Sequence, residues 1–198
     1  MFAEFISMPI SGQYHEKHFG TVGSISPQWV KFTDERGEEW VGSFDHGWEG
    51  HESFIIVLDT LGKAFVVAGG RSFLININTR EKINKVEVSD TKTALVHNRH
   101  HHIYYSSGYD LNYMDINGNL FNVYNDYYFD DIKLVEIRDN RLYAKYWSFQ
   151  SGLDPFDIEI DLLTKEVKDS FYDLRKEEDL YESPKPNWLV RVTKWITN

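Results

Sequence analysis

The sequence predicts an all-β fold, a single domain over 1–198 built from antiparallel meanders, either β-propeller-like or β-sandwich, with a short C-terminal helix. Three observations predict this class. Short apolar runs alternate with turn residues along most of the chain. Aromatic residues make up 16% of it, and broad rings pack well on the pleated surface of strands. Only one segment, near the C-terminus, has helical periodicity.

The first strands are expected on either side of tight turns. Residues 28–33 and 38–44 flank Asp34-Glu-Arg-Gly37, which predicts a hairpin with a glycine-containing loop. Residues 54–58 and 64–68 are almost continuously apolar. Runs of this length indicate strands that are buried on both faces rather than helices.

The same reasoning predicts strands through the middle of the chain. Asn117-Gly118 and Asp139-Asn140 are dipeptides that tolerate positive φ, so type I′ turns are expected there. The further strands are expected at 72–76, 83–88, 93–97, 103–106, 111–115, 119–124, 132–137, 141–147, 156–161 and 166–168.

A loose internal similarity relates the segments 65–85, 94–123 and 133–169. Each has a strand that ends near Val, a polar turn, an aromatic strand and an Ile-rich strand that ends in a second turn. The corresponding turns lie 39 and roughly 46 positions apart, which is near the spacing of propeller blades or stacked meanders. Ordinary meander connections remain an alternative explanation.

The C-terminal part begins with the helical segment. A helix is expected at about 169–181, where Ser170 has the character of an N-cap and Phe171 and Leu174 fall on one face. A closing strand is expected at about 188–195, because apolar and polar residues alternate there.

Composition limits the function classes. The formal net charge is −10, from 21 basic and 31 acidic residues, so anionic nucleic acid and lipid are disfavoured and basic proteins are favoured as partners. The absence of cysteine excludes disulfides, thiolate metal sites and cysteine nucleophiles. Neither a signal sequence nor an apolar run of membrane-spanning length is evident, so a cytoplasmic location is expected.

The stretch GSFDHGWEGHESF, residues 42–54, is the densest run of reactive side chains. Asp45, His46, Glu49 and His51 offer atoms that zinc accepts, yet their spacing matches no zinc motif and the glycines disfavour a helix. We therefore expect a structured loop between strands. A metal-dependent ligand-binding or hydrolytic domain that uses the Asp45–Glu52 loop is the alternative.

No catalytic motif appears elsewhere. The sequence lacks the nucleophile elbow, the phosphate-binding loop and the dinucleotide fingerprint, so no catalytic residue, cofactor or metal is assigned and a non-enzymatic protein is expected. The histidine triplet His100–His102 lies on a predicted strand, where at most two of its side chains share one face.

Acidic residues concentrate in the C-terminal half. Residues 126–182 hold sixteen Asp and Glu against eight Lys and Arg, and NDYYFDD (125–131) interleaves acids with aromatics. Tyr and Trp supply contact area at low entropic cost, while carboxylates steer a basic partner. The predicted partner-binding residues are Trp48, Glu49, Tyr127, Tyr128, Asp130 and Asp131.

The stretch DIKLVEIRDNRLYAKYWSF…PFDIEIDLLTKEVKD is similar to that of uncharacterised bacterial all-β proteins of this size. Small size, acidity and aromatic-rich β structure together also resemble the immunity proteins of polymorphic toxin systems. That resemblance implies a protein that binds and neutralises a cognate basic toxin. The motifs that carry it are strand and turn residues, so it assigns no functional residue.

Overall fold

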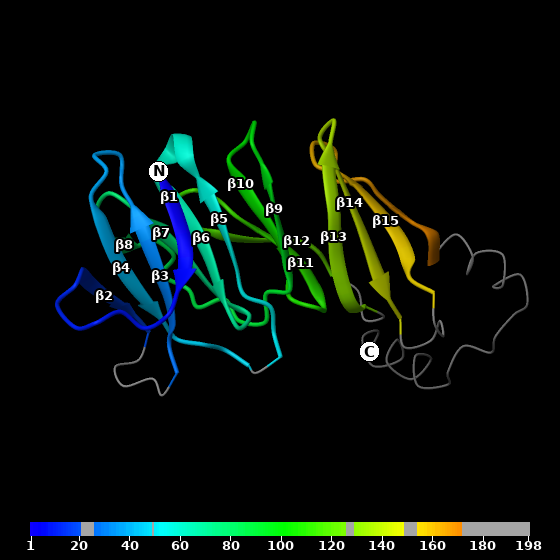
Figure 1. The fold of residues 1–198 in the computed structure, drawn as a ribbon. Helices are drawn as coiled ribbons and strands as arrows, with labels where there is room; N and C mark the ends of the chain where they lie inside the picture. Colours follow the sequence, from blue (N-terminus) through cyan, green and yellow to red (C-terminus); the bar gives the residue numbers. More distant parts are fainter. Residues whose placement is uncertain (21–25, 49, 126–128, 149–153, 172–198) are drawn as a thin grey trace, which may run out of the picture.

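The computed structural model describes residues 1–20, 26–48, 50–125, 129–148 and 154–171. In these ranges the chain forms four four-stranded sheets that stand side by side (Figure 1). The prediction of an all-β fold is confirmed. The expected closing strand at 188–195 lies outside the described residues, and so does the part of the expected helix beyond Phe171. Asp169, where that helix was expected to begin, is the last residue of a strand.

The sheets follow one another along the chain. Sheet 1 contains β1 (Phe2–Ile6), β2 (His15–Phe19), β3 (Gln28–Thr33) and β4 (Glu39–Phe44). Sheet 2 contains β5 (Phe54–Leu58), β6 (Lys63–Ala68), β7 (Arg71–Asn76) and β8 (Glu81–Lys82), with the 3-10 turn η1 (Asp59–Leu61) after β5. Sheet 3 contains β9 (Thr93–His97), β10 (His102–Ser106), β11 (Asp110–Met114) and β12 (Leu120–Asn125). Sheet 4 contains β13 (Asp130–Arg138), β14 (Arg141–Trp147), β15 (Phe156–Asp161) and β16 (Val167–Asp169).

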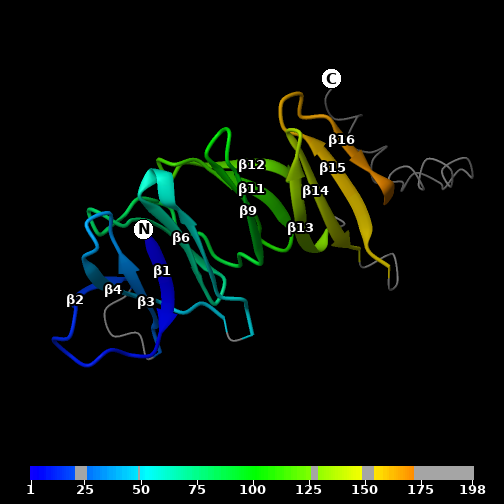
Figure 2. The same cartoon turned by 45° about the horizontal axis from the view of Figure 1, so that its top comes forward.

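Sheets 2, 3 and 4 are simple antiparallel meanders, but sheet 1 is not. Its order is β1-β3-β4-β2, and β2 pairs with β4 in parallel, from His15 opposite Trp40 to Phe19 opposite Phe44. The sequence analysis predicted neither β1 nor β2. Apolar cores join each sheet to the next along the chain, and among the described residues none joins sheet 1 to sheet 4, so the four sheets form an open stack (Figure 2).

Each pair of neighbouring sheets encloses an apolar core. β6 contributes side chains to two of these cores, because successive side chains of a strand point to opposite faces. Ala64 and Val66 join the core shared with sheet 1, whereas Phe65 and Val67 join the core shared with sheet 3. The expectation that 64–68 is buried on both faces is therefore confirmed. A third core lies between sheets 3 and 4.

The predicted strand at 83–88 is wrong. The ladder of β8 covers only Glu81 and Lys82. After one further backbone bond, from Ile83 to Leu74, the side chain of Asn84 supplies the pairing with β7, and the backbone pairs again at Val88 in an isolated bridge to Ser72. The Oδ1 of Asn84 accepts the N–H of Leu74 at 2.8 Å, and its Nδ2 donates to the carbonyls of Ser72 at 3.3 Å and Val86 at 2.9 Å. A side-chain amide offers the same donor and acceptor as a peptide group, so a pattern of apolar residues alone does not distinguish the two arrangements.

Of the two predicted type I′ turns, one is confirmed and the other is of a different type. Asp139 and Asn140 both have positive φ, 52° and 60°, as a type I′ turn requires. At Asn117-Gly118 only Gly118 does, with φ 80°. There Asp115 closes a three-residue loop by accepting the N–H groups of Asn117 at 2.8 Å and Asn119 at 2.9 Å through its Oδ1. An Asx turn thus replaces the expected two-residue turn.

Candidate functional site

The connections between the sheets meet at the lower end of the stack in Figure 1. We call this surface the inter-sheet rim: the connections 45–53 and 89–92, the β6–β7 turn at 69–70, the β10–β11 turn at 107–109, and the first residues of β13, at 130–131. Backbone hydrogen bonds join these segments directly. The N–H of Thr91 donates to the carbonyl of Gly70 at 2.8 Å, and that of Ile132 donates to Gly108 at 3.3 Å.

In its described residues, 45–48 and 50–53, the connection between β4 and β5 is a structured loop, as expected. Gly47 and Trp48 donate their N–H groups to the carbonyls of Ala68 at 3.0 Å and Gly69 at 2.9 Å, so the loop packs along the β6–β7 turn. A Cβ at position 47 would collide with the carbonyl oxygen of Gly69, which explains why glycine is required there. Backbone contact this close fixes the direction in which Trp48 projects.

Two aromatic side chains project from the rim into solvent. Trp48 is 70% exposed and Tyr109, in the β10–β11 turn, is 62% exposed. An exposed aromatic costs little conformational entropy to immobilise and supplies a large contact area, so both are suited to anchoring a partner. The sequence analysis missed Tyr109. The signal was its place in SSGYD, where Gly108 marks a turn that presents the next side chain.

Carboxylates accompany these aromatics. Asp131 binds Lys92, with Oδ1 and Nζ 3.0 Å apart, and Asp90 lies 3.2 Å from Nδ1 of His51. Asp90 and Asp131 both have left-handed backbones, with φ of 64° and 58°. Burial by itself lowers the pKa of Lys92, but the hydrogen bond that Lys92 donates to Asp131 and the charges of Asp131 and Asp90 outweigh it and raise the pKa above its usual value. Lys92 is thus a charged clamp within the rim.

The structure places three of the six predicted partner-binding residues on this rim. Trp48, Asp130 and Asp131 come from connections that are far apart in the sequence but join the same row of turns, and Asp130 is exposed. Glu49, Tyr127 and Tyr128 lie outside the described residues.

The described part of the loop contains no cluster of metal-ligating side chains, which the metal-dependent alternative would require. Asp45 forms an ion pair with Arg71, with Oδ2 and Nη1 3.2 Å apart, and His51 faces Asp90. Over the described ranges, no group of three or more His, Asp or Glu is arranged to hold a metal ion.

Histidines gather at the other end of sheet 3. The rings of His97 and His100 stack 4.7 Å apart between centroids, and those of His100 and His102 are 5.9 Å apart. His97 accepts the N–H of His100 through Nδ1 at 3.2 Å, while its Nε2 lies 3.2 Å from Oδ1 of Asn140 in sheet 4. Two members of the triplet thus neighbour each other, in accord with the expected limit.

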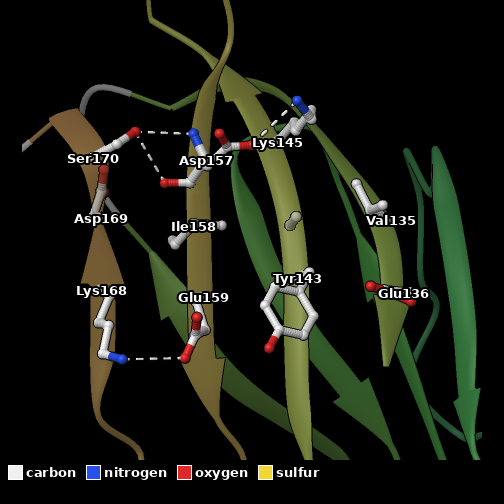
Figure 3. A pocket seen from close by; sticks show the side chains of 11 residues that line it. Val135, Glu136, Tyr143, Lys145, Asp157, Ile158, Glu159, Lys168, Asp169 and Ser170 are labelled. Carbon is white, nitrogen blue, oxygen red and sulfur yellow. Dashed lines mark hydrogen bonds and ion pairs between the residues drawn. The ribbon is translucent and has the colours of Figure 1, made fainter. Parts of the chain in front are cut away.

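A hollow of about 470 Å³ lies on the outer face of sheet 4 (Figure 3). Its charges neutralise one another across the strands: Lys145 binds Asp157 at 3.2 Å, and Lys168 binds Glu159 at 3.3 Å. Paired surface charges of this kind are typical of a solvated end face in a stack of repeats, so the hollow by itself indicates no ligand.

Comparison with known proteins adds little to this geometry. No family model and no curated protein matches the chain. Among solved structures, the N-terminal domain of Nup159 is similar over 63% of this chain and 34% of its own, with 12% identity and a TM-score of 0.45. A structure of S. cerevisiae Dbp5 bound to Nup159, Gle1, IP6 and ADP is similar over 56% of this chain and 30% of its own, with 13% identity and a TM-score of 0.41. The chain spans about a third of the length of these solved chains.

No helix in the described ranges is long and apolar enough to cross a membrane.

Proposed function

We propose that this protein is a non-enzymatic acidic binding protein whose inter-sheet rim binds a basic protein partner. The observation that carries the proposal is the presence of two highly exposed aromatics, Trp48 and Tyr109, and of several carboxylates on a row of turns that backbone hydrogen bonds join. Interface hot spots are enriched in such aromatic side chains, and carboxylates around them accelerate association with a positively charged surface.

The rim has the rigidity that a recognition surface needs. Its turns are held by backbone hydrogen bonds between successive sheets, and Lys92 ties the connection before β9 to Asp131 at the start of β13. Binding therefore costs little ordering of the backbone, and more of the contact energy is retained in the complex.

Within this class, the proposal is an immunity protein that neutralises a cognate bacterial toxin in the cytoplasm. The resemblance in size, acidity and β structure supports this role, and the formal charge of −10 suits a toxin that is basic because it attacks nucleic acid or membranes. An acidic rim would then cover the basic surface with which the toxin engages its target.

The test combines capture with a growth assay. The untagged protein is used to capture its partner from source cells, the partner is identified by mass spectrometry, and the two genes are then expressed together in a heterologous host. We expect the partner to be basic and toxic alone, and growth to be restored when this protein is present. The double variant Trp48→Ala, Tyr109→Ala is expected to lose both capture and protection.

Leu163→Ala is the matched control. Leu163 is 64% exposed, like the two aromatics, but lies in the β15–β16 turn, which packs beside the β13–β14 turn away from the rim. It is expected to behave as the wild type. A partner that is not toxic would contradict the immunity role, whereas a toxic partner neutralised equally well by the double variant would contradict the rim.

A further inference from the structure

A second cavity, of about 270 Å³, lies where the outer parts of sheets 1 and 2 meet. It is separate from the exposed aromatics of the rim. Its lining comes from the residues that follow β2 and β4, from the start of β7, and from the segment after β7 that begins with β8. The lining residues are Gly20, Asp45, Arg71, Ser72, Phe73, Lys82, Asn84, Glu87 and Val88.

Arg71 is fixed in this cavity from one side. Its Nη1 lies 3.2 Å from Oδ2 of Asp45, whose side chain is only 8% exposed. The carboxylate of Asp45 packs against the backbone of Gly20, where a Cβ would collide with it. Asp45 is therefore a buried anchor that orients the guanidinium, and such pairs are strongly held because separating them leaves a buried charge.

The other side of the guanidinium has a much weaker partner. Nη2 of Arg71 lies 2.9 Å from Oε1 of Glu87, but the Glu87 side chain is 66% exposed. Ion pairs with one partner so exposed contribute little to stability, because solvent screens them. The Glu87 carboxylate thus occupies a position from which another anion can displace it at small cost.

Lys82 supplies a second positive charge at the same cavity. Its Nζ lies 5.9 Å from the centroid of the Phe73 ring, and in the described ranges it forms no ion pair. The neutral polar groups of the lining are already used internally. Asn84 bonds to three backbone groups, and the hydroxyl of Ser72 donates to that of Thr91 at 2.7 Å. The groups available to a ligand are therefore a guanidinium and an ammonium.

We propose that this cavity binds a small anion bearing a carboxylate or phosphate group, which replaces Glu87 on Arg71 and is contacted by Lys82. Arg suits both headgroups because its planar fork bonds two oxygens at once. At about 270 Å³, the space accommodates a metabolite of few heavy atoms rather than a nucleotide or a peptide. The binding protein proposed above would then carry a small-molecule site beside its first sheet, which shares Asp45 with the rim but neither of the rim's exposed aromatics.

The test is an NMR titration of the ¹⁵N-labelled full chain with inorganic phosphate and with succinate, at matched ionic strength kept with sodium chloride. We expect saturable shifts of the amide signals of Ser72, Lys82 and Glu87 with at least one probe, and the probe that binds identifies the headgroup. If neither probe gives saturable shifts, the proposal is wrong.

Three variants, each with a glutamine of similar length, test the roles of Glu87 and Lys82 in anion binding. Glu87→Gln is expected to bind the probe about threefold more tightly or better, because the internal competitor has lost its charge. Lys82→Gln is expected to bind about threefold more weakly. Lys85→Gln changes the same charge on the same segment but does not line the cavity, and should leave the affinity unchanged. If Lys82→Gln and Lys85→Gln weaken binding equally, the anion is attracted only by the general positive charge of this segment, and the proposed site is wrong. If Glu87→Gln leaves the affinity unchanged, the anion does not displace Glu87 from Arg71.

Discussion

Asn84 holds Leu74 by a hydrogen bond of 2.8 Å from the backbone N–H of Leu74 to the side-chain Oδ1 of Asn84. Leu74 is fully buried in β7, and Asn84 is almost fully buried. The bond continues the ladder of sheet 2 beyond β8, where a side chain takes the place of a strand's backbone. It also lies beneath the β11–β12 turn of sheet 3, since a Cβ on Gly118 would meet the backbone of Asn84.

Replacing this amide should cost more than an ordinary polar substitution. In Asn84→Ala, the N–H of Leu74 and the carbonyl of Ser72 lose their partner in a buried place, and an unsatisfied buried group costs about 1–3 kcal/mol. We expect the free energy of unfolding, measured by urea denaturation, to fall by about 2–4 kcal/mol. Asn122→Ala, at an exposed position, is the control; similar losses at both positions would contradict the role of Asn84.

Two glycines allow the contact between sheets 2 and 3 to be measured separately from backbone strain. Gly37 and Gly118 occupy equivalent Asx loops with φ of 81° and 80°. A Cβ at Gly37 has no atom within 4 Å, whereas one at Gly118 would lie 2.7 Å from Cα of Asn84. Gly118→Ala should therefore lose about 1–3 kcal/mol more stability than Gly37→Ala in thermal or urea unfolding. Equal losses would show that only the dihedral matters.

The histidine cluster should make stability depend on pH. Burial, followed by the charge of His100, lowers the pKa of both His97 and His102 below the ordinary 6.5. The folded protein then binds these protons more weakly than the unfolded chain, so their contribution is present above about pH 6.5 and is lost as the pH falls from there through the lowered pKa values. We expect the urea midpoint to fall between pH 7.5 and 5.5.

The variant His97→Asn assigns that dependence. Its midpoint should fall less steeply with decreasing pH than that of the wild type, whatever its absolute stability. His101→Asn is the matched control, because His101 is exposed and asparagine tolerates its φ of 54°. A slope that is unchanged in His97→Asn would mean that other groups govern the acid response.

Thr93 joins sheets 3 and 4 near the rim. Its Oγ1 accepts the N–H of Leu134 at 3.0 Å and lies 2.9 Å from the hydroxyl of Ser106. Thr93→Val keeps the shape but removes both bonds, and should lower the free energy of unfolding by about 1–3 kcal/mol. Thr33→Val, on a strand of sheet 1, is expected to change it by less than about 0.5 kcal/mol. Amide hydrogen exchange should show the added opening at Leu134; its absence there would contradict the bridging role.

Much of the fold follows from local patterns in the sequence. The continuous apolar run 64–68 requires burial on two faces, since successive side chains of a strand point in opposite directions, and this holds whatever packs on either side. Asp139-Asn140 likewise selects its turn, because both residues tolerate positive φ. These features were predictable because they depend on the residues themselves and their immediate neighbours.

The candidate site was predictable only in part. Trp48 and Asp131 stood out by composition, but nothing in the sequence places them in the same row of turns, and Tyr109 was missed. These three residues lie on the same row of turns only because sheets 1 to 4 stack, and the stacking brings together connections from distant parts of the chain. The cavity around Arg71 has the same origin, because it combines residues that follow β2 and β4 with residues of β7.

The sequence by itself determined the β class, most strands and the acidity, because strand alternation, turn dihedrals and charge are properties of short segments. Only the tertiary structure decided that β2 pairs in parallel with β4, that the side chain of Asn84 supplies part of the pairing in sheet 2, and that the rim and the cavity around Arg71 exist. Each of these depends on hydrogen bonds or packing between residues far apart in the chain, and such long-range complementarity leaves no periodic trace in the sequence.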